Sequence, residues 1–148
     1  MIHLEVLTAE SPVISMDAES VVATTLNGQI GILRGHVPLV TVLQPGELIV
    51  RTGDHETYLA ISGGFLRVKA RGVVVLADTC EYAEDIDVER AERARRRAEV
   101  LLQTGGPQMD AASTEAALRR AVARLRVADK YRLKSRRKVT GSFARETL

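Results

Sequence analysis

The chain has 148 residues, of which 45% are hydrophobic and 3% aromatic, with one cysteine and a net charge of +2. These numbers suit one medium or two small packed domains and exclude a disordered chain or a disulfide framework. The scarcity of aromatic residues argues against stacking on nucleobases, and the lack of a signal peptide or an 18-residue apolar run leads us to expect a soluble protein of a reducing compartment.

Charge is divided unevenly along the chain. Residues 1–84 carry 5 Lys and Arg against 10 Asp and Glu, a net of −5, whereas residues 85–148 carry 16 against 9, a net of +7. We therefore expect the two parts to differ in structure and in partners.

The first 80 residues predict short strands separated by turns. β-Branched residues and period-two patches favour an all-β sandwich, with turns at 27–28, 45–46, 53–54 and 71–72. No stretch there has helical periodicity over 10 to 15 residues, which disfavours alternating strands and helices. The expected strands are 2–9, 20–26, 28–33, 39–43, 47–52, 56–62, 64–70 and 72–78.

Residues 85–135 predict an antiparallel helical hairpin. Asp87 is placed to cap the first helix, with Ile86 able to pack on Ala91. The first helix has a narrow seam of small residues, and Gly105, Gly106 and Pro107 end it. The seam of the first helix is Ala91, Ala94, Ala98 and Leu101; the second helix, from about Asp110 or Ser113, has Leu118, Ala121, Leu125 and Ala128 on one stripe, with Val122 beside it.

Alanine contacts bury little apolar area, because each buried CH₂ contributes only about 0.8 kcal/mol before ordering entropy is subtracted. The closed hairpin is therefore expected to be marginally stable. A ligand that binds the closed form would shift that equilibrium, so the hairpin is a candidate switch element. Residues 136–148 are basic and lose the apolar stripe, which predicts a frayed helix end and a disordered tail.

Catalytic and metal motifs are lacking in the sequence. There is no phosphate-binding loop, which argues against nucleotide hydrolysis, and His3, His36 and His55 lack metal-ligand spacing. Cys80 ends a buried-looking run, where a packed thiol is favoured over a nucleophile. We predict no catalytic residue and no metal site, although acidic residues are dense at Asp78, Glu81, Glu84, Asp85 and Asp87.

The second predicted helix carries a cationic strip. A solvated face, an acidic protein groove, RNA or an anionic ligand would each explain it. Arg120 and Arg124 lie one turn apart and can grip one phosphate group together. The strip consists of Arg119, Arg120, Arg124, Arg126, Lys130, Arg132, Lys134, Arg136, Arg137 and Lys138.

Several stretches, in order over about residues 1–135, resemble the epsilon subunit family of the bacterial F-type ATP synthase, called delta in mitochondria. They read IHLEVLTAE, GQIGILRGHVPLVTVLQPGEL, AISGGFLRV, VVVLADTCEYAEDIDVERAERARRRAE and TEAALRRAVARLRVADKY. The resemblance implies a β-sandwich of residues 1–84 that contacts the gamma subunit and the c-ring, and a regulatory hairpin of residues 85–135. The ring-facing region it implies is Gly28, Gln29, Ile30, Gly35 and His36.

The same resemblance implies a regulatory ligand. In some family members ATP binds the folded hairpin at an Ile-Asp-x-x-Arg-Ala motif, present here at residues 86–91. The implied ATP-binding residues are Glu81, Asp87, Arg90, Ala91, Arg97, Arg120 and Arg124. Arginines there can surround a triphosphate, while the two acids accept hydrogen bonds from adenine or ribose.

The resemblance further implies a rotor subunit on the cytoplasmic face of the inner membrane, held there only through its complex. An opened hairpin would meet the beta and alpha subunits and block ATP hydrolysis. No obligatory cofactor and no nucleic acid are expected. The chain has Gln29 where members often have Glu, and Arg34 where they often have Pro. The alternative from charge alone is a β-domain whose basic hairpin binds RNA or another polyanion.

Overall fold

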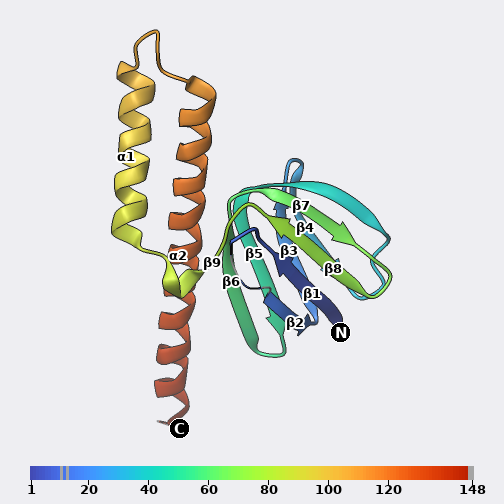
Figure 1. The fold of residues 1–148 in the computed structure, drawn as a ribbon. Coiled ribbons are helices and arrows are strands. Elements are labelled where there is room, and N and C mark those ends of the chain that lie inside the picture. Colours follow the sequence, from blue (N-terminus) through green and yellow to red (C-terminus); the bar gives the residue numbers. More distant parts are fainter. Residues whose placement is uncertain (11, 13, 147–148) are drawn as a thin grey trace.

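The computed structural model describes residues 1–146 apart from 11 and 13, with side chains up to Val139. The described residues form a β-sandwich followed by two antiparallel helices, which confirms the expected fold class (Figure 1). The strands are β1 Ile2–Leu7, β2 Ile14–Ala18, β3 Ser20–Thr25, β4 Gly28–Leu33, β5 Leu39–Thr52, β6 His55–Ile61, β7 Gly64–Val68, β8 Gly72–Ala77 and β9 Cys80–Tyr82.

The sandwich is a continuous sheet folded over on itself by β5. The first part of β5 pairs with β7 and the second part with β6, while β3 pairs with both parts across a shift in register. The order is β2-β1-β8-β7-β5-β3-β4, and β6 and β9 continue from β5. Alternate residues of these strands point inward, as their period-two pattern requires. The core is dominated by fully buried Leu4, Ile32, Leu48, Leu59 and Leu66.

The prediction of a turn at residues 45–46 is wrong, because β5 runs through Pro45 and Gly46. Gly46 pairs with Ile61, and a Cβ at this position would lie 2.7 Å from the Cβ of Thr24. Glycine at this position permits a close approach between β5 and β3, so it serves packing inside a strand and does not mark a turn.

Strands β2 and β9 were not expected, and neither was the parallel pairing of β1 with β8. Strand β2 pairs with the preceding strand β1, whereas β9 and the β1–β8 pairing depend on partners that are separated from them by other strands. The Gly63-Gly64 step before β7 has positive φ at both residues, and a Cβ on Gly64 would lie 1.9 Å from the carbonyl oxygen of Leu76. Only glycine therefore fits the start of β7.

The hairpin consists of α1, Val88–Thr104, and α2, Ala111–Glu146. Asp87 caps α1 by accepting a hydrogen bond from the backbone N–H of Arg90 at 3.0 Å, and Asp110 accepts one from the N–H of Ser113 at 3.2 Å. Ala91 and Ala98 are buried in the expected seam, but Leu101 is 43% exposed. Leu101 was wrongly placed there, because a step of four residues from Ala98 brings Leu102, which is half-buried, to the seam.

The expected disordered tail is also corrected, because α2 continues through Glu146; residues 147 and 148 lie outside the described part. The segment contains four Lys or Arg residues and one Ala, which have high helix propensity, and its one internal glycine costs only about 1 kcal/mol. These last turns continue past the sandwich (Figure 1). Within the described residues, neither helix is long and apolar enough to cross a membrane.

Helix α2 is buried on two sides. One side meets α1, and the other covers the outer face of β5 and β6 (Figure 1). Val127 and Ala128 pack there against Ile49, Tyr58 and Ala60. Ala83 and Ile86, at the entry to α1, belong to the same cluster, so this second small core fixes the hairpin beside the sandwich.

Candidate functional site

A cavity of about 470 Å³ lies where the hairpin meets the end of β6 and strand β9. Its volume is within the usual range for small-molecule sites. Both helices and the sandwich contribute to its walls, so it exists only while the hairpin is docked. The lining residues are Ala60, Ile61, Ser62, Thr79, Cys80, Glu81, Arg90, Ala94, Ala117, Arg120, Ala121 and Arg124.

Local structure places the charged residues of this cavity. Asp87 caps α1 and so fixes where the helix begins. Arg90 and Ala94, four residues apart on this helix, both border the cavity. Arg120 and Arg124 are likewise one turn apart on α2. The antiparallel pairing of β9 with β6 brings Glu81 opposite Ala60, at the rim that faces α2.

Glu81 and Arg124 form a bidentate ion pair. The Nε and Nη2 atoms of Arg124 each donate to a different carboxylate oxygen of Glu81, both at 2.9 Å. The two side chains are 30% and 28% exposed, so the pair is partly screened from water. This geometry fixes the Arg124 guanidinium at the cavity wall and ties α2 to β9.

The structure brings four of the seven residues implied for ATP into the lining: Glu81, Arg90, Arg120 and Arg124. Asp87 is exposed and engaged as the cap of α1, while Ala91 is fully buried in the hairpin contact. Arg97 is exposed and lies outside the described lining, two turns from Arg90.

Three polar lining residues were missed by sequence reasoning. Ser62 accepts hydrogen bonds from the backbone N–H of Thr79, at 2.9 Å, and from its hydroxyl, at 2.8 Å. Cys80 lies beside them; burial, and secondly the charge of Glu81, raise the pKa of its thiol to about 11. Ser62 directly follows β6, whereas Thr79 and Cys80 stand at the start of β9. The pairing of β9 with β6 has no local signal in the sequence.

The arrangement is suited to holding an anion. Three arginines line the cavity with one carboxylate, and arginine binds phosphate in a bidentate manner. A thiol with a raised pKa is a poor nucleophile. The described lining includes no histidine, and the described residues hold no group of three or more His, Cys, Asp or Glu placed to bind a metal. The site therefore has the chemistry of a binding site.

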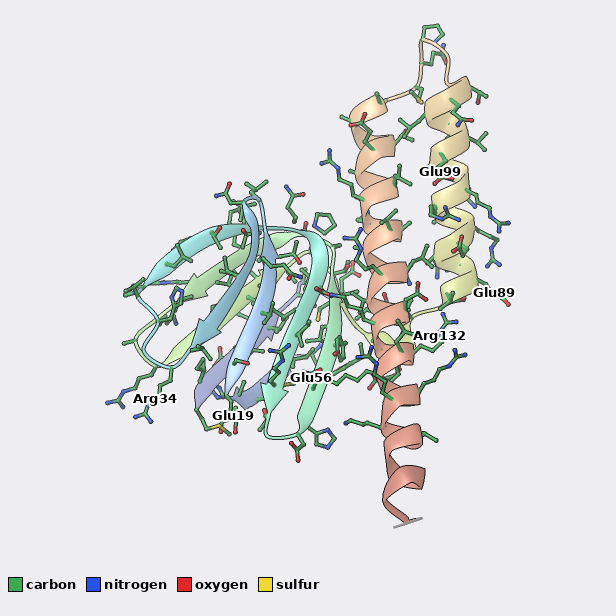
Figure 2. All side chains as sticks on the ribbon, turned by 180° about the vertical axis from the view of Figure 1, so that it is seen from behind. Glu19, Arg34, Glu56, Glu89, Glu99 and Arg132 are labelled. Carbon is green, nitrogen blue, oxygen red and sulfur yellow. The ribbon has the colours of Figure 1, made fainter. Side chains whose placement is uncertain are left out.

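The implied ring-facing residues are not brought together. Gly28 and Gln29 begin the edge strand β4 and border a groove against α2, whereas Gly35 and His36 border a groove at the other end of the sandwich. Strand β4 separates the two pairs by roughly 17 Å at the usual rise of a strand. Ile30 lies between them and packs against the sandwich core. Figure 2 shows Arg34 at the sandwich end away from the helices.

A separate apolar surface lies on the outer face of β5, β7 and β8. Val42, Phe65 and Leu76 occupy neighbouring register positions and are 39%, 54% and 51% exposed. Val40, two residues before Val42 on the same side of β5, is more exposed still. A row of exposed apolar side chains on a flat sheet is typical of a protein-binding surface.

Comparison with known proteins matches both parts of the chain to one family. Residues 1–83 match the β-sandwich domain, and residues 84–129 the long α-helix domain, of the ATP synthase delta/epsilon chain. The ATP synthase epsilon chain of Dehalococcoides mccartyi is 48% identical over 132 residues, covering 88% of this chain and 94% of the relative. That of Herpetosiphon aurantiacus is 49% identical over 128 residues, covering 86% and 93%.

Among solved structures, a chain in the mitochondrial ATP synthase of Euglena gracilis, in an assembly described as OSCP/F1/c-ring, superimposes with a TM-score of 0.74. It is 26% identical in sequence, and the match covers 82% of this chain and 78% of that one. The likeness therefore extends to both the sandwich and part of the hairpin.

The raised pKa of Cys80 gives a testable consequence. Because only the thiolate reacts and each pKa unit changes its fraction tenfold, alkylation by iodoacetamide at pH 8 should be about a hundredfold slower in the folded chain than in urea. The rate should still rise with pH above 9. Equal rates in the folded and unfolded chain, measured by mass spectrometry, would contradict the burial of this thiol.

Proposed function

This chain belongs to the ATP synthase delta/epsilon chain family, and on that premise we propose that it is a non-catalytic subunit of the central stalk of a proton-translocating F-type ATP synthase. Two family domains matched in order over residues 1–129 support this assignment. In that role the sandwich is the attached part and the hairpin the regulatory part. The subunit couples rotation driven by proton flow to ATP synthesis in the catalytic head.

The docked hairpin is proposed to sense ATP. The single observation that carries this proposal is the cavity, which collects Arg90, Arg120 and Arg124 beside Glu81. A triphosphate supplies the negative charge that the three arginines favour, and Glu81 can accept a hydrogen bond from an amino or hydroxyl group. Because both helices and the sandwich form the walls, a bound nucleotide would stabilise the docked state over the open one.

The open hairpin is proposed to inhibit ATP hydrolysis. Alanine dominates the contact between α1 and α2, so little apolar surface resists separation. Undocking would also free the cations of α2, three of which face sandwich carboxylates in this state: Arg124, Lys130 and Lys134. Those cations can then meet acidic surface on the beta and alpha subunits.

The sandwich is proposed to attach the subunit to gamma and to the c-ring. The apolar row of Val42, Phe65 and Leu76 suits a protein contact. Two of its strands, β7 and β8, lie on the side of the sandwich away from the helices (Figure 1). The end with Gly35 and His36 also carries Arg34, Lys69 and Arg71, which suits a polar contact with the ring. Membership in the complex would hold the subunit at the cytoplasmic face of the membrane as a peripheral protein.

Calorimetric titration of the full chain with ATP tests the sensor role. Wild type is expected to bind one ATP at millimolar concentration or below, and Arg120→Ala should bind about tenfold or more weakly, because it loses a charge-assisted contact. Arg119→Ala is the matched control, since Arg119 borders the groove on another side of α2. No heat from wild type, or equal losses in both variants, would reject ATP sensing at this cavity.

Phe65→Glu tests attachment through the apolar row. It should weaken binding to purified gamma subunit about tenfold or more, because a charge would be buried without a partner at an aromatic contact. Its unfolding midpoint should stay near that of wild type, because the side chain is 54% exposed. Val100→Glu, on α1 and similarly exposed, is the control; if both variants bind gamma equally well, this surface is not the contact.

A further inference from the structure

The distal part of α2 holds the sandwich through ion pairs remote from the cavity. The Nζ atom of Lys130 donates to the Oε1 atom of Glu47 on β5 at 2.6 Å, and Lys134, one turn later, pairs with Glu56 on β6. Figure 2 shows Glu56 where the sheet faces α2. Both lysines lie beyond residue 129, the last residue that matches the long α-helix domain of the family.

Glu47 is an unusual partner because its side chain is only 4% exposed. Its Oε1 atom also accepts from the side-chain amide of Gln29 on β4, while its Oε2 atom has no hydrogen-bond partner among the described residues. A buried carboxylate with one unsatisfied oxygen depends strongly on its cation. The cation comes from the hairpin, so the sandwich is electrostatically complete only when α2 is docked.

Glu56 is held in place before α2 arrives. Its Oε1 atom accepts from Arg51 at 2.8 Å, and its Oε2 atom accepts from the hydroxyl of Tyr58 at 2.5 Å. Lys134 then meets a fixed carboxylate, and its Nζ atom also lies 5.9 Å from the centre of the Tyr58 ring, within the range of a cation–π contact. Because Arg51 and Tyr58 already hold the Glu56 side chain, pairing with Lys134 costs little further side-chain entropy on the sandwich side.

The ion pairs of Arg124 and Lys130 flank the apolar contact between α2 and the sheet, and the pair of Lys134 lies one turn beyond Lys130. Val127 is fully buried and Ala128 nearly so between the positions of Arg124 and Lys130, and Tyr131 packs at the edge of the same cluster. Apolar neighbours exclude water, which strengthens charge pairing relative to an open surface. The pairs and the apolar contact are therefore made and broken together.

We propose that Glu47 with Lys130, and Glu56 with Lys134, form a clasp that keeps the hairpin docked on the sandwich in the absence of nucleotide. The proposal rests on the proposed movement of the hairpin and adds a second control of it. The four clasp residues lie outside the described lining of the cavity, so clasp and ligand stabilise the docked state separately. The edge strand β4 enters the clasp through Gln29.

The test measures hairpin opening in the nucleotide-free full chain. A cysteine replaces Ala128, which is 6% exposed against the sheet, and Cys80→Ser removes the natural thiol. The labelling rate at position 128 then reports the open population. Glu47→Gln and Lys130→Met should each raise this rate about tenfold to a hundredfold, because each removes a hydrogen bond between charged groups. The double variant should add little further, since both changes break one interaction.

Asp129→Asn is the matched control. The side chain of Asp129 is 67% exposed and pairs with Arg132 on the same helix. Loss of this exposed ion pair should change the labelling rate less than twofold. A second reporter at Ala18, which is fully buried in the sandwich core, measures opening of the sandwich itself and should label slowly in every variant. Lys130→Met decides the question if Glu47→Gln disturbs the sandwich, because Lys130 is 45% exposed and contributes nothing to that core.

The host is the chain that carries only Cys80→Ser and the cysteine at position 128. The clasp would be overturned if Lys130→Met labels at the same rate as the host, or if the effects of the two single variants multiply in the double variant. Adding ATP separates this result from the sensor proposal. ATP should slow labelling by the same factor in the host and in the clasp variants. If ATP slows labelling but the clasp variants do not change it, only the clasp proposal is rejected. If the clasp variants change labelling but ATP does not, only the sensor proposal is rejected.

Discussion

The packing of α2 on the outer face of β5 and β6 is the contact on which the rest of the structure depends. It gives Ile49, Tyr58 and Ala60 a buried position on a sheet face that would otherwise be open to water. It also creates the cavity, because two of the cavity walls belong to helices that lie on the sandwich only through this contact. This small interface thus decides whether the cavity exists.

The division of charge along the chain has an internal explanation. Acidic residues of the sandwich receive cations of the hairpin at three places along α2, so the two oppositely charged parts are partners of each other in the docked state. A cationic strip engaged in this way is less available to RNA or another polyanion. In the proposed movement of the hairpin, the same cations would become available to a new acidic surface, which would link internal pairing to regulation.

The sequence was sufficient where the signal is local. The cap at Asp87, the alternation in the strands and the hairpin stop at Gly105 each involve neighbouring residues, and the structure has them. Pairing between distant segments was not accessible: β9, the course of β5 through Pro45, and the cations that pair with Glu47 and Glu56 all follow from tertiary contacts. For the site, the resemblance supplied four lining residues, but Ser62, Thr79 and Cys80 required the structure.

The central claim is that the hairpin is a movable element whose docked position is held by ligand and by the sandwich. The most direct measurement is single-molecule fluorescence energy transfer in the assembled ATP synthase, between a dye at the hairpin tip near Gln108 and a dye on gamma. The account predicts one docked population at millimolar ATP and a second, extended population after ATP removal. A single distance that is independent of ATP would contradict it.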